Sequence, residues 1–270
     1  MFVARLFPKD STYFKQSQGY FSKLGKTMDS GGWMNLFPIW ALVISGIVVN
    51  LDYNDRYIYW DWGGWILGLS KLVLATFIYF LFLRPKMLWQ LGMKILNLKE
   101  ILFHAFIAMI FLLIGWLDSG IILSTLPILI PYCFAFLSGV MIFQFQLELD
   151  KENGVWNHFE WTNKIEFLST SLILMALAIF LSILYDDPIL STSAAVSFPF
   201  PLITLLWPNH VRHLQRARIF PLFTLTMFLC VRLPWFLIPV AILFFVIRTI
   251  NYFRYGIIYP SFGVDFLEEN

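Results

Sequence analysis

A run of acidic and amide side chains stands near the middle of the chain, between two apolar stretches. It reads Gln144-Phe-Gln-Leu-Glu148-Leu-Asp150-Lys-Glu152-Asn153-Gly154. We expect Glu148 and Glu152 to lie one turn apart at the end of a helix, with Asp150 between them. Carboxylates in this arrangement suit Mg²⁺, which prefers oxygen ligands and bridging phosphates. The alternative is a solvated helix end that turns into a loop at Gly154.

Lys71 is a charged residue inside an apolar stretch, where charge is costly and polar groups are often functional. It lies about 10 Å inside a predicted helix, at about 1.5 Å per residue. We expect its side chain to reach outward to the lipid headgroups, because its length nearly covers that depth. The alternative is an ion or proton partner in the bundle interior, near Asp52, Asp55 or Asp118.

Histidines and glutamines supply the remaining candidates. His104 is predicted to be a hydrogen-bonded histidine rather than a haem ligand, since a second buried histidine is missing. Gln144 is expected either to line a cavity or to bond across helices. His210 and His213 have a spacing that allows shared metal binding on a helix. Because Arg212, Arg216 and Arg218 lie beside them, contact with lipid phosphate is the favoured interpretation.

Two stretches resemble the UbiA-type prenyltransferase superfamily. The acidic run, followed by Gly154 and by Asn163-Lys164 at the start of an apolar helix, resembles the family's second acidic region. Leu83-Arg84-Pro85, followed by Leu98-Lys99-Glu100-Ile101, resembles the stretch after its first acidic motif. The resemblance covers roughly half of the chain through short motifs. The family's first Asp-rich motif is missing, because 84–100 carries only Glu100 as an acid.

This resemblance implies a lipid- or isoprenoid-handling helical bundle that transfers prenyl groups to aromatic or lipid acceptors. Glu148, Asp150 and Glu152 would then match the ligands of Mg²⁺ and diphosphate, and Arg84 and Lys94 would contact phosphate. The incomplete acidic motifs leave open whether the chain is an enzyme. Two other functions are alternatives: a non-catalytic membrane subunit or scaffold of a larger complex, and a small-solute or ion transporter that uses Lys71.

Composition predicts the elements that must position these groups. Of 270 residues, 59% are hydrophobic and 13% are charged, whereas soluble domains carry about 25% charged residues. The surplus of apolar side chains must face lipid. We predict an all-α polytopic bundle with eight transmembrane helices, of which the fourth is kinked by Pro127 and Pro131. The predicted spans are 36–51, 64–83, 101–117, 121–145, 166–185, 189–207, 219–231 and 233–252.

The positions of the basic residues predict the orientation. Eight spans place sixteen of the 19 Lys and Arg residues on one side. Because cytoplasmic loops carry an excess of Lys and Arg, both termini are expected in the cytoplasm, in a bacterial inner membrane. The net charge of +2 is too small to indicate nucleic-acid binding. Membrane lipids are the expected partners, and a protein partner would accompany the subunit alternative.

The chain divides into three predicted segments. Residues 1–34 form a cytoplasmic segment whose mixture of Lys, Tyr and Phe suits a helix on the membrane surface. A partner-docking arm is the alternative, because Gly19, Gly25 and the Gly31-Gly32 pair weaken a helix. Residues 35–253 form the transmembrane bundle, and residues 254–270 form a cytoplasmic tail. No internal repeat is visible.

Overall fold

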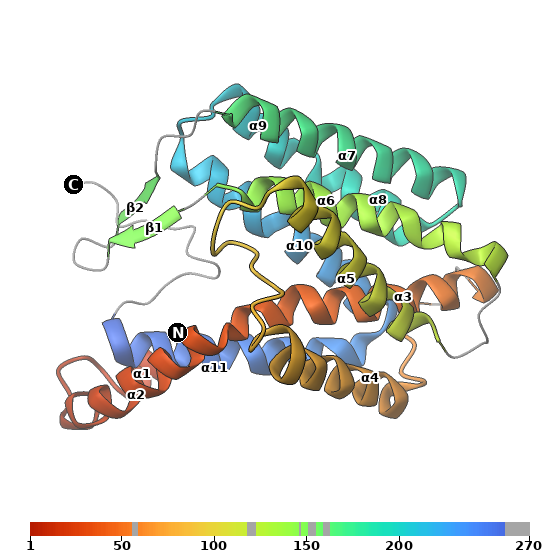
Figure 1. Ribbon diagram of the computed structural model, residues 1–270. Coiled ribbons are helices and arrows are strands. Elements are labelled where there is room, and N and C mark those ends of the chain that lie inside the picture. Colours follow the sequence, from red (N-terminus) through yellow and green to blue (C-terminus); the bar gives the residue numbers. More distant parts are fainter. Residues whose placement is uncertain (56–58, 118–122, 146, 151–154, 159–162, 257–270) are drawn as a thin grey trace.

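Helices make up most of the computed structural model (Figure 1), which describes residues 1–55, 59–117, 123–145, 147–150, 155–158 and 163–256. Among these residues, eight helical segments are long and apolar enough to cross a membrane. This confirms the predicted all-α bundle and its eight spans. The segments are Trp33–Leu51, Trp65–Leu83, Leu98–Trp116, Leu126–Phe143, Lys164–Leu184, Pro188–Leu206, Val211–Arg232 and Pro234–Tyr255.

Several of these spans are built from more than one helical element. In chain order the elements are α1 (Phe2–Leu6), α2 (Thr12–Gly31), η1 (Trp33–Asn35), α3 (Leu36–Asp55), α4 (Trp65–Ile78), η2 (Tyr79–Leu83), α5 (Leu98–Trp116), η3 (Leu123–Leu129), α6 (Ile130–Phe143), β1 (Leu147–Asp150), β2 (Val155–His158), α7 (Lys164–Leu184), α8 (Pro188–Ser197), α9 (Pro199–Leu206), α10 (Val211–Arg232), η4 (Pro234–Phe236) and α11 (Leu237–Tyr255). Here η2 is a π-helical turn and the other η elements are 3₁₀ turns.

Proline accounts for the shape of the fourth span. Pro131 lies in the first turn of α6, where its missing N–H leaves no intrahelical bond unmade. Pro127 lies within the preceding 3₁₀ segment, η3. The span changes from 3₁₀ to α-helix before Ile130, in the region where the kink is predicted.

The seventh span begins earlier than the sequence prediction of residue 219. Helix α10 starts at Val211, so it includes Arg212, Arg216 and Arg218. The predicted start at residue 219, which leaves these three arginines outside the span, is therefore wrong. Hydropathy alone excluded them from the span, whereas the helix continues through them because arginine is a good helix former.

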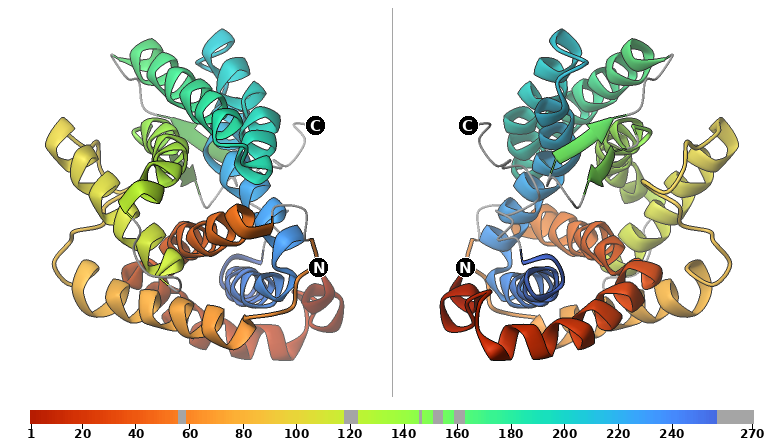
Figure 2. Two further views of the ribbon diagram at one scale, coloured as in Figure 1. Left: turned by 90° about the vertical axis from the view of Figure 1, so that its right-hand side faces the viewer. Right: turned by 90° about the vertical axis from the view of Figure 1, so that its left-hand side faces the viewer.

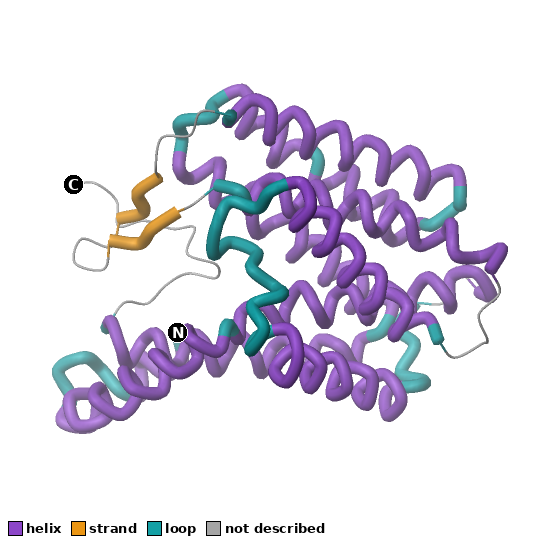
Figure 3. The backbone as a smooth tube through the Cα atoms, viewed as in Figure 1, coloured by secondary structure: helices purple, strands orange, loops and turns teal. Residues whose placement is uncertain are grey.

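A two-stranded hairpin follows α6 and is the one sheet among the described residues (Figure 3). Strands β1 and β2 are antiparallel, and Glu148 pairs with Asn157. The predicted helical spacing of the acidic run is thus wrong for Glu148 and Asp150, because α6 ends at Phe143 and both residues lie in β1. Glu152 lies outside the described residues.

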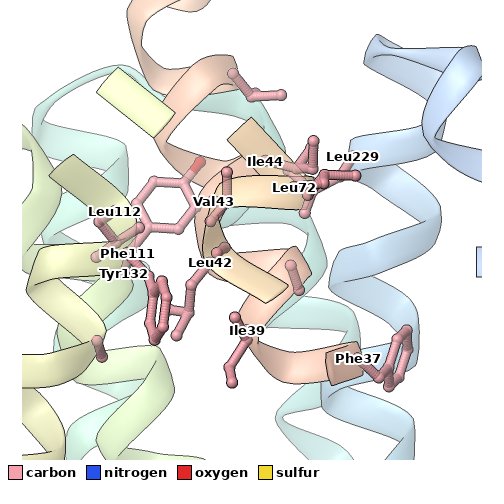
Figure 4. Packing of buried hydrophobic residues seen from close by; sticks show 14 of the residues in the cluster. Phe37, Ile39, Leu42, Val43, Ile44, Leu72, Phe111, Leu112, Tyr132 and Leu229 are labelled. Atoms are coloured by element: carbon pink, nitrogen blue, oxygen red, sulfur yellow. The ribbon is translucent and has the colours of Figure 1, made fainter. Parts of the chain in front are cut away.

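Helix α3 passes through the centre of the main hydrophobic core (Figure 4). Ile39, Val43 and Ile44 are completely buried there. Its closest neighbour is α5, which it approaches through a pair of glycines. A Cβ added at Gly46 would lie 2.0 Å from the carbonyl oxygen of Leu112, and one at Gly115 would lie 1.9 Å from that of Val43. Only glycine permits this approach of the two backbones.

The N-terminal segment forms a helix, as predicted, and α2 contacts the last span, α11. The two helices extend together beyond the bundle at the lower left of Figure 1. The side chain of Ser11 caps α2 by accepting the Phe14 N–H. Phe21 stacks on Phe253 with a centroid separation of 4.4 Å. The side of α2 that carries Phe21 is therefore packed against α11.

Candidate functional site

A cavity of about 990 Å³ lies inside the bundle. Its walls come mainly from α3, α6, α10 and α11, with parts of α2, α8 and the loop at 91–93. Phe37 of α3 and Phe244 of α11 both line it, and their rings meet edge to face at 4.9 Å. Figure 2 shows α3, α10 and α11 close together in two further views. Most lining residues are apolar, as is usual for small-molecule pockets of this size.

One end of this cavity is cationic. Helices α10 and α11 diverge from the turn η4, so the start of α10 and the end of α11 lie at the same end of the bundle (Figure 1). Arg218 of α10 and Arg248 and Arg254 of α11 all line the cavity. Among the described lining residues, Asp29 is the only carboxylate. We call these four residues the cationic end, and it carries a net positive charge.

Helix α10 presents Gln215, Arg218, Leu222 and Leu225 to the cavity. Spacings of three and four residues place these side chains on one helix face, so the face changes from polar to apolar along its length. Gln215 is only 3% exposed, yet among the described residues neither its Nε2 nor its Oε1 has a hydrogen-bond partner. A buried amide without partners is destabilising, and a bound ligand or an ordered water would relieve this cost.

Arg218 packs against an aromatic ring, and no hydrogen bond joins it to another of the described residues. Its guanidinium group lies 4.7 Å from the centroid of the Phe143 ring, a cation–π contact between α10 and α6. A Cβ added at Gly92 would lie 3.3 Å from Nη2 of Arg218. Within the described part of the chain, no carboxylate pairs with Arg218.

Arg254 differs from Arg218 because it has a partner from a distant part of the chain. Its Nη2 lies 2.8 Å from Oδ2 of Asp29, an ion pair between α11 and α2. The Arg254 side chain is 6% exposed and that of Asp29 is 65% exposed. This ion pair connects the N-terminal helix to the cationic end.

The rest of the cavity wall is mainly apolar, with a few hydroxyl groups such as those of Ser45 and Ser193. Leu225, Val240 and Leu190 line it from three helices. Ser45 of α3 also lines the cavity and is 1% exposed, and within the described part of the chain its Oγ has no hydrogen-bond partner. The cavity therefore combines an anion-attracting end with space for hydrocarbon.

Lys71 lies outside the cavity lining and does not reach the headgroups. It is 7% exposed, and its Nζ donates a hydrogen bond of 2.6 Å to the carbonyl oxygen of Gly115. The prediction that this side chain extends to the membrane surface is wrong, because it is buried and the carbonyl oxygen of Gly115 accepts a hydrogen bond from it. Lys71 does not line the cavity described above, and the transporter alternative stays a prediction.

His104 and Gln144 have structural partners. His104 Nδ1 lies 2.7 Å from the Glu100 carbonyl oxygen, and its Nε2 accepts the Gln90 N–H at 3.0 Å. This matches the predicted hydrogen-bonded histidine. The Oε1 of Gln144 accepts the Leu96 N–H at 2.7 Å. Gln144 therefore fixes the loop before α5 and does not line the cavity.

The two predicted phosphate contacts also have other partners. Nε of Arg84 donates to the carbonyl oxygen of Ser30 at 2.8 Å, in the last turn of α2. Lys94 forms an ion pair with Glu100. Neither residue lines the cavity, so the structure does not bring Arg84 and Lys94 together with the cationic end.

The acidic run is only partly described. Glu148 and Asp150 lie in β1, while Glu152 and the side chains of all three lie outside the described residues. Elsewhere in the described chain, no group of three or more His, Cys, Asp or Glu side chains gathers to hold a metal ion. The Mg²⁺ site proposed from the sequence therefore stays a prediction.

Sequence reasoning missed the cationic end, although a signal was present. The predicted seventh span, 219–231, leaves out Arg218, and Arg248 lies within the predicted span 233–252 but is not among the candidate site residues. The positions of Gln215, Arg218 and Leu222 follow helical spacing and would have predicted one face, had the span been extended to Val211. Comparison with protein-family models, curated proteins and solved structures gave no match.

Proposed function

We propose that this multi-pass membrane protein binds an anionic amphiphile of the lipid or isoprenoid class inside its helical bundle. The observation that carries the proposal is the cavity of about 990 Å³, apolar over most of its wall and cationic at one end. Arginine suits this task because its guanidinium group binds phosphate or carboxylate oxygens in pairs. The positive-inside pattern places this end, in our proposal, at the cytoplasmic face.

The balance of charge favours binding of an anion over catalysis by metal. Arg218 has no carboxylate partner among the described residues, and Asp29 already pairs with Arg254. Prenyl transfer of the UbiA type would need an acidic Mg²⁺ site. That activity stays a separate prediction, which depends on Glu148, Asp150 and Glu152.

Mass spectrometry of the protein purified in mild detergent tests the proposal. We expect a bound amphiphile that bears a phosphate or another anionic group. Arg218→Gln and Arg248→Gln should each lower its occupancy about tenfold, because a hydrogen bond to a charged group contributes about 1.5–3 kcal/mol. Arg216→Gln is the matched control, since Arg216 is exposed on the same helix and lies outside the cavity lining.

The outcomes separate clearly. Loss of the amphiphile in the two cavity variants, with retention in Arg216→Gln, supports the proposal. Equal occupancy in all four proteins, or a wild-type protein that carries no anionic amphiphile, overturns it. Monodisperse elution and an unchanged unfolding temperature exclude misfolding as the cause of a loss.

A further inference from the structure

The side-chain amide of Gln215 indicates what the bound headgroup must offer. Its Nε2 is a hydrogen-bond donor and its Oε1 is an acceptor. Both atoms are buried and lack partners, and the residue lines the cavity. Leaving such a group unsatisfied costs about 1–3 kcal/mol. A ligand that satisfies Gln215 must therefore both accept and donate hydrogen bonds.

A second acceptor near Gln215, the backbone carbonyl of Ala217, also favours a ligand that donates a hydrogen bond. Pro221 lies inside α10 and lines the cavity. Proline has no N–H, so it cannot donate to the carbonyl of Ala217, four residues earlier. Ala217 also lines the cavity. The same part of α10 thus carries an amide oxygen and a carbonyl that lacks its usual intrahelical donor.

Arg218 supplies the anion contact next to these acceptors. It follows Gln215 by three residues, which puts both side chains on one face of α10. Its guanidinium group donates hydrogen bonds only. The site therefore presents positive donors for an anion and, one turn away, acceptors for an O–H or N–H group.

We infer that the headgroup is a phosphate ester that carries a hydroxyl group. The phosphate oxygens would bind Arg218 and the Gln215 Nε2, and the hydroxyl would donate to the Gln215 Oε1. An ionised carboxylate has no proton to donate. A choline group has no N–H, and an ethanolamine group would bring a positive charge toward Arg218. This inference rests on the proposed function, because it needs the cavity to bind an anionic amphiphile.

Three lipids with identical acyl chains test the inference by native mass spectrometry of the full-length protein in detergent. Phosphatidylglycerol is anionic and carries hydroxyl groups. Phosphatidylmethanol has the same phosphate charge without a hydroxyl, and phosphatidylcholine has neither net charge nor a hydroxyl. We expect phosphatidylglycerol to bind about five- to tenfold more tightly than phosphatidylmethanol, as one hydrogen bond provides. Phosphatidylcholine should bind most weakly.

A variant then assigns the preference to Gln215. In Gln215→Leu we expect phosphatidylglycerol and phosphatidylmethanol to bind equally, and both still more tightly than phosphatidylcholine. Gln16→Leu is the matched control, because Gln16 is exposed on α2. If Gln215→Leu does not fold, the comparison of the three lipids with the wild-type protein still decides the matter.

The failures of the two proposals can be distinguished. Equal binding of phosphatidylglycerol and phosphatidylmethanol to the wild-type protein, both above phosphatidylcholine, overturns the hydroxyl inference and leaves the proposed function standing. Equal binding of all three lipids overturns both. A preference for phosphatidylglycerol that survives in Gln215→Leu removes Gln215 from the headgroup site.

Discussion

The ammonium group of Lys71 and the carbonyl oxygen of Gly115 meet at 2.6 Å, which joins α4 to the last turn of α5. Carbonyls in the last turn of a helix have no intrahelical donor. Lys71 thus completes the hydrogen bonding of α5 inside the bundle.

Lys71→Met is expected to destabilise the protein without affecting the cavity. The Gly115 carbonyl would lose its donor, so we expect the free energy of unfolding to fall by about 1–3 kcal/mol. Thermal unfolding in detergent measures this, with Lys99→Met as the control because Lys99 is exposed. Bound amphiphile per folded molecule should stay constant. Unchanged stability together with lost binding would contradict this structural role.

Gly46→Ala and Gly115→Ala should each be destabilising by about 1–3 kcal/mol, as is typical when extra atoms enter a packed core. The added methyl group would lie within 2.0 Å of a carbonyl oxygen of the facing helix, so α3 and α5 would have to separate. The unfolding temperature reports the effect. Gly19→Ala is the control, since a Cβ there meets nothing within 4 Å, and it should leave stability the same or slightly higher.

The prediction of spans from the sequence succeeded because apolar length is a direct requirement of the membrane. The spans at 64–83 and 189–207 agree with the structure within a few residues. The error at the seventh span arose because arginines seemed to end the apolar stretch. In the structure Arg218 contacts Phe143 and lines the cavity, so an internal site accommodates it.

The candidate site was harder to predict than the fold. Lys71 and Arg84 are polar or charged residues of the kind that often marks function, yet each hydrogen-bonds a backbone carbonyl. Whether such a group is used structurally depends on residues 44 and 54 positions away in the chain. A single amino-acid sequence does not show which of these distant residues pair with one another. Arg248 was missed for the same reason. Its place at the cationic end depends on how α11 packs against α10, which the sequence does not show.

Asp29→Asn should loosen α2 from α11. Arg254 is 6% exposed and would lose its charged partner, which we expect to lower the opening free energy of α2 by about 1 kcal/mol. Hydrogen exchange within 12–31 should become about fivefold faster. Asp10→Asn is the control, since Asp10 is exposed. Equal exchange in the two variants would show that apolar contacts alone hold the helix.

The chain before the first span and the chain after the eighth span should lie on the same side of the membrane. The described spans number eight, so the chain returns to the side from which it started. With the positive-inside rule, reporter proteins fused before Trp33 or after Gly256 should be cytoplasmic, and a reporter inserted near residue 57 should be outside. Protease access in sealed vesicles measures this. A cytoplasmic reporter near residue 57 would reverse the proposed orientation.

The hairpin of β1 and β2 indicates how far water reaches along the bundle. In the described part of the chain each strand of this ribbon pairs along one edge only, and hydrocarbon cannot supply hydrogen bonds to the other edge. Water or phosphate groups must therefore reach the level at which α6 ends and α7 begins. Strand β2 also touches α10, the helix that carries Arg212, Arg216 and Arg218.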